Sequence, residues 1–286
     1  MTTILVTGAN GQLGSCIRDI APTCEGLSFV FTTKEVFDIS NKQLVQDYFS
    51  NKNFDYCINA AAYTNVEQAE KDAENAFRIN AEGAKNLAEA CATNSIILIH
   101  ISTDYVFNGE KESPYTETDA TDPINVYGAS KLKGEQYVQE ACAQHFILRT
   151  SWVYSQYGHN FLKTILKHAK AGNPLSITTE QTGAPTNAND LAAVTVALIK
   201  KNRQEFGVYH FSNEGKATWY DFAHEILTQH SQLTTTNLAK TEHYPTFAKR
   251  PKNSVLDTGK AIKVLGIETK DWKERLRSVM SILETT

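Results

Sequence analysis

The residues with the clearest capacity for chemistry in this sequence are Tyr127 and Lys131, which stand four positions apart. On an α-helix this spacing places two side chains one above the other on the same face. A free phenol has a pKa of about 10, and a nearby ammonium group lowers that pKa toward neutrality by stabilising the phenolate. The pair is therefore a candidate general acid/base. Ordinary solvent-exposed helices show the same spacing, so the neighbouring elements must show whether this pair is catalytic.

A glycine-rich turn near the N-terminus is a second candidate site. Residues 3–7 are apolar and β-branched, which predicts a buried strand, and a helical period starts at Leu13. Gly8, Gly11 and Gly14 lie in the turn, so strand, turn and helix follow in the order that dinucleotide binding requires. Glycine lets the backbone approach a pyrophosphate closely, and the helix N-terminus attracts its charge. The spacing differs from the common G-x-G-x-x-G pattern, so a turn without a ligand is the alternative.

Polar residues stand at the end of a later apolar run, residues 95–102. Ser102 closes this run, and Thr103 and Asp104 follow it. A hydroxyl beside a tyrosine acid can hydrogen-bond the oxygen that receives the proton. Successive strand residues point to opposite faces, so we expect only one of Ser102 and Thr103 to reach a substrate. In the absence of the tyrosine and lysine, Thr103 would merely mark the end of the strand.

Composition excludes several classes of function. The chain of 286 residues carries a net charge of −4 and no basic cluster, so we expect no nucleic-acid partner. No apolar stretch reaches the ~20 residues of a membrane span, and no signal-peptide pattern precedes residue 3. The five cysteines show no C-x-x-C pair, and no cluster has metal-ligand spacing. We expect a cytoplasmic protein with reduced thiols and no metal.

Apolar runs and helical periods alternate up to about residue 150. We expect strands at residues 3–7, 27–32, 54–60, 95–102, 146–149 and 208–211, and helices at residues 41–50, 73–91, 190–201, 219–229 and 272–283. This alternation predicts an α/β fold with a doubly wound, Rossmann-type parallel sheet. We assign residues 1–150 to a dinucleotide-binding domain and residues 151–286 mainly to a smaller mixed α/β substrate lobe. Within the second part, residues 186–212 are expected to return to the first domain.

One rim of the sheet should carry the site. Ligands bind at the carboxyl ends of the strands in doubly wound sheets. The glycine turn, residues 60–64, residues 102–104 and residues 150–152 follow such strand ends. The helix of Tyr127 follows the strand that ends at Ser102, so it can face the same cleft.

Short motifs along nearly the whole chain resemble those of one family. They read Gly8-x-x-Gly11-Gln12-Leu13-Gly14, Asn-Ala-Ala-Ala-Tyr-Thr at 59–64, Ser-Thr-Asp-Tyr-Val-Phe at 102–107, Tyr127-Gly-x-x-Lys131, Arg-Thr-Ser-Trp-Val-Tyr at 149–154, Gln-Thr-Gly-Ala-Pro-Thr at 181–186, Thr-Trp-Tyr-Asp-Phe at 218–222 and Arg-Pro-x-Asn-Ser at 250–254. Each motif alone is unspecific. In this order they resemble the dTDP-4-dehydrorhamnose reductases, a family of extended short-chain dehydrogenases/reductases.

The resemblance implies an NAD(P)H-dependent enzyme that reduces the C4 ketone of dTDP-4-dehydro-6-deoxy-L-mannose to dTDP-L-rhamnose, for cell-surface polysaccharide. Tyr127 would protonate the new alkoxide, Thr103 would hold the C4 oxygen, and Lys131 would support the tyrosine and bind the nicotinamide ribose. Substrate contacts are implied for Thr103, Asp104, Tyr105, Trp152, Asn160 and Arg250. Cofactor contacts are implied for Gly8, Gly11, Gln12, Leu13, Gly14, Lys34, Asp38, Ile39, Ala60, Ala62, Tyr63 and Thr64, besides Tyr127 and Lys131. For Arg250 an ordinary surface arginine is an equally open interpretation.

Two details refine these expectations. An acidic residue at the end of the second strand would select NADH, whereas Lys34 stands there, so we expect NADPH to be preferred and NADH to be a second cofactor. The alternative is that Lys34 is a solvated loop lysine. Some members of the family dimerise around Mg²⁺ held by glutamates, but residues 15–16 and 187–189 contain none. We therefore expect no Mg²⁺ site, and either a monomer or a metal-independent homodimer.

Two other functions remain open. The first is a related nucleotide-sugar epimerase, dehydratase or 4-ketoreductase. Dehydratases need an acid/base pair beside the strand-end threonine, and no second carboxylate adjoins Asp104. The second is a non-catalytic, reductase-like regulatory subunit. Intact Thr103, Tyr127 and Lys131 argue against it, although fold alone never decides function.

Overall fold

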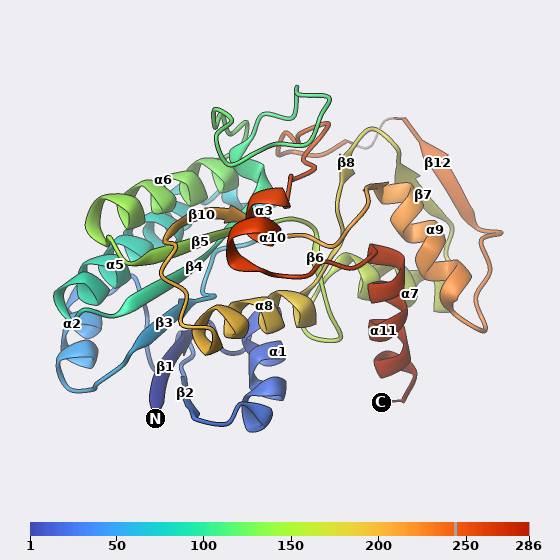
Figure 1. The fold of residues 1–286 in the computed structure, drawn as a ribbon. Coiled ribbons are helices and arrows are strands. Elements are labelled where there is room, and N and C mark those ends of the chain that lie inside the picture. The colour runs from blue at the N-terminus through green and yellow to red at the C-terminus, as the bar shows by residue number, and fades with distance from the viewer. Residues whose placement is uncertain (243–244, 286) are drawn as a thin grey trace.

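The computed structural model describes residues 1–242 and 245–285, and its centre is a six-stranded parallel sheet (Figure 1). The strands lie in the order β10 (Gly207–His210), β5 (His145–Thr150), β4 (Ile97–Thr103), β3 (Tyr56–Asn59), β1 (Thr2–Thr7) and β2 (Leu27–Phe31). Every neighbouring pair is parallel. The chain moves outward from β1 to β2 and then returns to the other side of β1 with β3. This reversal creates a crevice at the carboxyl ends of β1 and β3. The predicted α/β, doubly wound fold is confirmed.

Helices cover both faces of this sheet. On one face α1 (Gln12–Ile20) packs with α8 (Ala188–Lys200), and on the other lie α2 (Lys42–Ser50), α5 (Gly83–Thr93) and α6 (Val126–Ala141). Alternation along β1 explains the two layers, because Ile4 and Val6 enter the core on the α1 side and Leu5 enters the core on the α5 side. Both faces are apolar, as parallel sheets require.

The helix expected at residues 73–91 is interrupted in the structure. It consists of α4 (Ala73–Phe77), a π-helical turn η2 (Arg78–Glu82) and α5. Asn80 lies in the π turn, and its amide accepts from the backbone N of Tyr63 at 2.8 Å and donates to the oxygen of Tyr63 at 3.0 Å and to Ser130 Oγ at 2.9 Å. The inserted residue thus turns Asn80 toward the 60–64 loop. Single-turn π-bulges of this kind are frequent at functional sites.

The remaining elements surround a second core. It contains Tyr154, Leu162, Phe222, Trp272 and Leu276, among others. Its helices and strands are β6 (Val153–Tyr154), α7 (Phe161–Lys170), β7 (Leu175–Thr178), β8 (Thr182–Gly183), β9 (Thr186–Asn187), β11 (Ala217–Thr218), α9 (Trp219–Gln229), β12 (Leu238–Thr241) and α11 (Trp272–Thr285). They form the right-hand part of Figure 1. The domain boundary near residue 150 stays a prediction.

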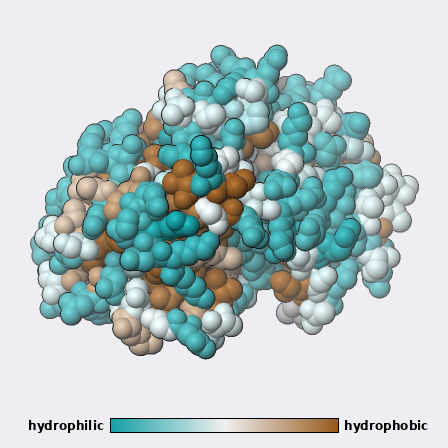
Figure 2. All heavy atoms as spheres, viewed as in Figure 1, coloured by the Kyte–Doolittle hydropathy of each residue, from teal (hydrophilic) through white to brown (hydrophobic). Residues whose placement is uncertain are grey.

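Four short elements complete the part of the chain that the structure describes: η1 (Ala21–Thr23), α3 (Val66–Ala69), η3 (Asp104–Val106) and α10 (Gly259–Leu265). The face drawn in Figure 2 is largely hydrophilic, with a hydrophobic area near its centre where α10 lies. Within the described ranges, none of the helices is long and apolar enough to cross a membrane. All five cysteines are buried and free.

Candidate active site

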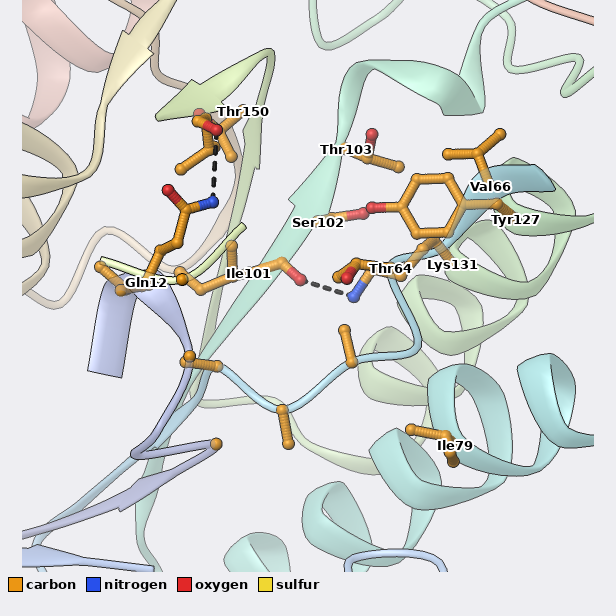
Figure 3. Close-up of a pocket in the computed structure, with 18 of the residues that line it drawn as sticks. Gln12, Thr64, Val66, Ile79, Ile101, Ser102, Thr103, Tyr127, Lys131 and Thr150 are labelled. Atoms are coloured by element: carbon orange, nitrogen blue, oxygen red, sulfur yellow. Dashed lines mark hydrogen bonds between the residues drawn. The ribbon is translucent and has the colours of Figure 1, made fainter. Parts of the chain in front are cut away.

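A cleft of about 720 Å³ opens at the carboxyl ends of the central strands (Figure 3). Most of the predicted site residues line it, and they are Gly8, Gly11, Gln12, Leu13, Lys34, Asp38, Ile39, Ala60, Ala62, Thr64, Thr103, Asp104, Tyr105, Tyr127, Lys131, Trp152, Asn160 and Arg250. Gly14 and Tyr63 are not among the lining residues. The structure also adds Val66, Ile79 and Trp219, which had no predicted role, and Thr150, from the predicted rim segment 150–152, to the lining.

Glycine is required at two positions of the N-terminal turn. Gly8 has φ +65°, and a Cβ there would lie 2.6 Å from the backbone oxygen of Ala60. A Cβ on Gly14 would lie 2.6 Å from the oxygen of Gly8. Gly14 therefore packs α1 against the turn, which explains why it does not line the cleft. Gly11 is the N-cap of α1 and offers no side-chain cap, so the positive end of the helix opens on the cleft.

Asp38 lines the same cleft and is held there as a hydrogen-bond acceptor. It accepts from the backbone N of Ser40 at 2.9 Å and from Ser40 Oγ at 2.7 Å, and Arg78 lies 3.8 Å away. Partial burial raises the pKa of Asp38, but the hydrogen bonds from Ser40 and the charge of Arg78 outweigh it and keep that pKa below its usual value. The carboxylate is therefore ionised and suited to accept from an exocyclic amine. Lys34 also lines this cleft.

Close packing brings Tyr127 to the end of β4. The helix α6 begins after Asn125, whose Oδ1 accepts from the backbone N of Gly128 at 2.8 Å. A Cβ on Gly128 would lie only 2.1 Å from the backbone oxygen of Tyr105. Glycine at this position lets the first turn of α6 approach η3, and Tyr127 then lies beside Ser102 and Thr103 (Figure 3).

The pKa of Tyr127 departs from the sequence-based expectation. Burial raises it well above the usual value, and the neighbouring Thr103 hydroxyl lowers it only in part. The expected lowering by Lys131 is therefore wrong for this structure. The reason is geometric, because Lys131 Nζ donates to the backbone oxygen of Ile101 at 2.7 Å and lies 3.4 Å from His100 Nε2. A tyrosine with a raised pKa keeps its proton, which suits a proton donor.

Four buried polar atoms of cleft-lining residues have no partner within the described chain: Ser102 Oγ, Thr150 Oγ1, Asp104 Oδ2 and Arg250 Nε. Both Ser102 and Thr103 line the cleft, because the chain turns into η3 directly after Thr103. Thr103 Oγ1 donates to Asp104 Oδ1 at 2.9 Å. Burial raises the pKa of Asp104 to about 7, although hydrogen bonds from Ser254 and Thr103 oppose the shift. Unpaired buried hydroxyl and carboxyl oxygens are suited to bind the hydroxyl groups of a sugar.

Two stacked indoles form part of the cleft wall. The ring centroids of Trp152 and Trp219 are 3.6 Å apart and the rings are nearly parallel, at 5°. Gly183 makes room for this stack, since a Cβ there would lie 2.4 Å from the Trp152 ring. Trp219 Nε1 donates to Gln181 Oε1 at 2.9 Å. Trp219 belongs to the family motif at 218–222, but the motif by itself predicted no place for Trp219 in the cleft.

Asn160 and Arg250 connect the second core to the cleft. Asn160 caps α7, accepting from the N of Lys163 at 3.0 Å, and its Nδ2 donates to Gln12 Oε1 at 2.9 Å. Arg250 forms an ion pair with Glu67 at 2.8 Å and lies 3.5 Å from the hydroxyl of Tyr105. The arginine is thus a paired residue of the cleft wall. In the part of the chain that the structure describes, no group of His, Cys, Asp or Glu gathers as a metal site.

Comparison with known proteins agrees with this geometry. The sequence profile of the family described as "RmlD substrate binding domain" matches residues 1–285. A protein of Escherichia coli strain K12 named dTDP-4-dehydrorhamnose reductase is 40% identical over 99% of this chain and 98% of its own. The chain belongs to the dTDP-4-dehydrorhamnose reductase family. The resemblance stated from the motifs is confirmed.

Solved structures of this family share the whole fold. A dTDP-4-dehydrorhamnose reductase from Clostridium acetobutylicum superposes with a TM-score of 0.94 at 37% identity, covering 99% of this chain and 100% of its own. The enzyme from Bacillus anthracis, solved in complex with NADP, gives a TM-score of 0.93 at 36% identity over the same shares of the two chains. The family thus includes a member with a nicotinamide dinucleotide bound.

Proposed function

We propose that the protein is a dTDP-4-dehydrorhamnose reductase that uses NADPH to reduce the C4 ketone of its dTDP-sugar to dTDP-L-rhamnose. One observation carries the proposal: the proton donor Tyr127 lines the same cleft as a glycine turn that leads into a helix N-terminus. Family membership supports it, since relatives along the full chain bear this name.

The cleft fits a nicotinamide dinucleotide. Gly8 and Gly11 leave the backbone bare beside the N-terminus of α1, where a pyrophosphate is favoured. Asp38 and Ile39 line the far end for the adenine, while Lys131 can bind the nicotinamide ribose. When bound, NADPH supplies the hydride. Asn80 fixes the backbone of Tyr63 and thereby the loop that faces the nicotinamide half.

The residues around Tyr127 supply the proton and orient the ketone. Tyr127 carries its proton near neutrality, so it is present as the acid form that can donate to the carbonyl oxygen as negative charge develops there. Thr103 lies beside it and can hydrogen-bond the same oxygen. The free oxygens of Ser102 and Asp104 are placed to bind neighbouring sugar hydroxyls. Apolar walls, including Val66 and Trp152, limit the access of water.

The test is the loss of NADPH absorbance with dTDP-4-dehydro-L-rhamnose for the wild type, Tyr127→Phe and a control, Tyr137→Phe. Removing the acid should lower kcat by roughly 10²–10⁴-fold. Tyr137 lies on the same helix but outside the cleft, so its variant should keep full activity. Absence of turnover by the wild type, or near-normal turnover by Tyr127→Phe, would overturn the proposal. Tightly held NAD⁺ in the purified protein would instead favour an epimerase or dehydratase.

A further inference from the structure

A chain of buried polar side chains crosses the sheet and ends at Lys131. Thr7, Asn59 and His100 are register neighbours on β1, β3 and β4. Thr7 Oγ1 donates to Asn59 Oδ1 at 2.8 Å, and Asn59 Nδ2 lies 3.0 Å from His100 Nδ1. His100 Nε2 in turn lies 3.4 Å from Lys131 Nζ. All four side chains are almost fully buried, with exposures between 1% and 2%.

The direction of these hydrogen bonds follows from one backbone group. The N–H of Ala61 points at Asn59 Oδ1 from 3.2 Å, and a backbone N–H can only donate. The opposite amide orientation would set two donors against each other. Asn59 Nδ2 therefore donates to His100, so Nδ1 is an acceptor and the single ring proton lies on Nε2. Burial, and next the charge of Lys131, hold the pKa of His100 well below its usual value, so the ring stays neutral.

His100 consequently presents a fixed N–H to Lys131. An ammonium group has no lone pair to accept this N–H, whereas a neutral amine has one. The other titratable groups around the pair are Tyr127 and Glu135 on α6, Asp104 and Tyr105 on η3, and His145 on β5. Burial lowers the pKa of Lys131 to about 8, and Glu135, which is paired with Arg149 at 2.6 Å, opposes that shift. The N–H of His100 acts in the same direction as burial.

We propose that His100 is a positioning residue for Lys131. Its Nε2–H donates to the neutral amine form of Lys131 and thereby favours release of a proton from the ammonium form. The inference rests on the proposed reduction. In that reaction the ketone carbon receives a hydride from NADPH, and its oxygen receives the proton of Tyr127. Lys131 then loses one ammonium proton, which an intervening water carries to the tyrosinate, and becomes a neutral amine. Water later returns this proton to the amine.

Two substitutions separate this role from packing. In His100→Asn the short side chain occupies the place of Nδ1 and cannot reach Lys131, whereas His100→Gln places an amide near the position of Nε2. We expect His100→Asn to move the alkaline limb of the kcat profile upward by about one pH unit, the worth of one ordinary hydrogen bond. Its kcat near neutrality should fall about tenfold, with the KM for NADPH unchanged. His100→Gln should lie close to the wild type in both the alkaline limb and kcat.

His145→Gln serves as the control, because His145 is also buried but bonds only to the backbone oxygen of Cys142. It should keep the wild-type profile. A folded His100→Asn with an unmoved alkaline limb, or equal behaviour of the Asn and Gln variants, would overturn the inference.

A measurement without substrate tests the role of His100 independently of the proposed reaction. ¹⁵N NMR of the histidine rings in the whole protein should show His100 neutral with its proton on Nε2. Its shift should change with a midpoint near pH 8, where Lys131 titrates. An Nδ1–H tautomer, or a ring that becomes charged near neutrality, would contradict the inference even if the wild type reduced no sugar.

Discussion

The backbone oxygen of Tyr105 lies 2.1 Å from where a side chain on Gly128 would begin, so α6 and η3 are in direct backbone contact beside the candidate acid. No Cβ fits in this space without a shift of one element. The glycine of the Tyr-Gly-x-x-Lys motif is therefore a packing requirement. It couples the position of Tyr127 to that of Thr103.

Gly128→Ala should test this coupling. The overlap is with backbone, which cannot rotate away, so we expect a loss of roughly 1–3 kcal/mol in the free energy of unfolding. We also expect kcat to fall at least tenfold, because a displacement of about 1 Å in an active site is costly. Urea unfolding and steady-state kinetics measure the two effects. Gln136→Ala on the exposed side of α6 is the control, and wild-type kinetics in Gly128→Ala would contradict the explanation.

Asp104→Asn should change how stability depends on pH. Burial raises the pKa of Asp104 from 3.8 to about 7. Between these values the folded protein keeps a proton that the unfolded chain has lost, so the wild-type free energy of unfolding falls as pH rises through this window. Asparagine does not titrate, so the variant lacks this fall in the free energy of unfolding. The variant should gain stability relative to the wild type from about pH 4 to about pH 7, by on the order of 2 kcal/mol or more.

Urea midpoints of both proteins at acidic and mildly alkaline pH give the measurement. The difference between the proteins isolates Asp104 from the other titrating groups. Asp119 offers a control of opposite sign, because hydrogen bonds from Lys111 and Thr116 lower its pKa to about 2. Parallel pH dependences of the wild type and Asp104→Asn would show that the carboxyl is ionised throughout.

Lys34→Ala should reduce the preference for NADPH. Lys34 lines the cleft near Asp38, where an ammonium group could meet the 2′-phosphate. We expect kcat/KM for NADPH to fall about tenfold while the value for NADH changes little, since a charged hydrogen bond contributes roughly 1.5–3 kcal/mol. Lys42→Ala is a matched control, because Lys42 pairs with Glu89 outside the cleft. Unchanged discrimination between NADPH and NADH would show that Lys34 is a solvated loop lysine with no role in cofactor selection.

EDTA should leave the assembly of the protein unchanged. Residues 187–189 bring amides, not carboxylates, to the start of α8, and Asn187 is used there as the helix cap. Hard divalent cations prefer carboxylate oxygens, so we expect a monomer or a homodimer that needs no metal. Light scattering with and without EDTA measures the mass. A dimer that dissociates in EDTA would contradict this expectation.

The rim of the sheet could be predicted because it follows from simple rules. Alternating apolar runs and helical periods predict parallel strands, whose carboxyl ends meet at one edge. Gly8, Thr103 and Trp152 follow such strand ends, and they line one cleft. Predicted strand ends differed from the observed ones by one to two residues, as at β3 and β4.

Other features depend on contacts that no local pattern contains. The π turn at Arg78–Glu82 inserts one residue, which a helical period averages out. The raised pKa of Tyr127 depends on burial by elements far away in the sequence. Likewise, the tautomer of His100 depends on the backbone N–H of Ala61, through Asn59. The motifs predicted which residues meet, but not how their charges are balanced.

The pairing of Arg250 with Glu67 leads to a last prediction. Their side chains are 23% and 40% exposed, so solvent screens the pair and its worth to folding is small, about 0–1 kcal/mol. Its place in the cleft wall suggests a functional role, in which the arginine meets the diphosphate of the substrate. Arg250→Met should raise the KM for the dTDP-sugar about tenfold or more and leave the KM for NADPH unchanged. Glu67→Gln removes the competing carboxylate but keeps the arginine, so it should raise that KM much less. Equal effects of both substitutions on the two KM values would show that the pair only supports the wall of the cleft.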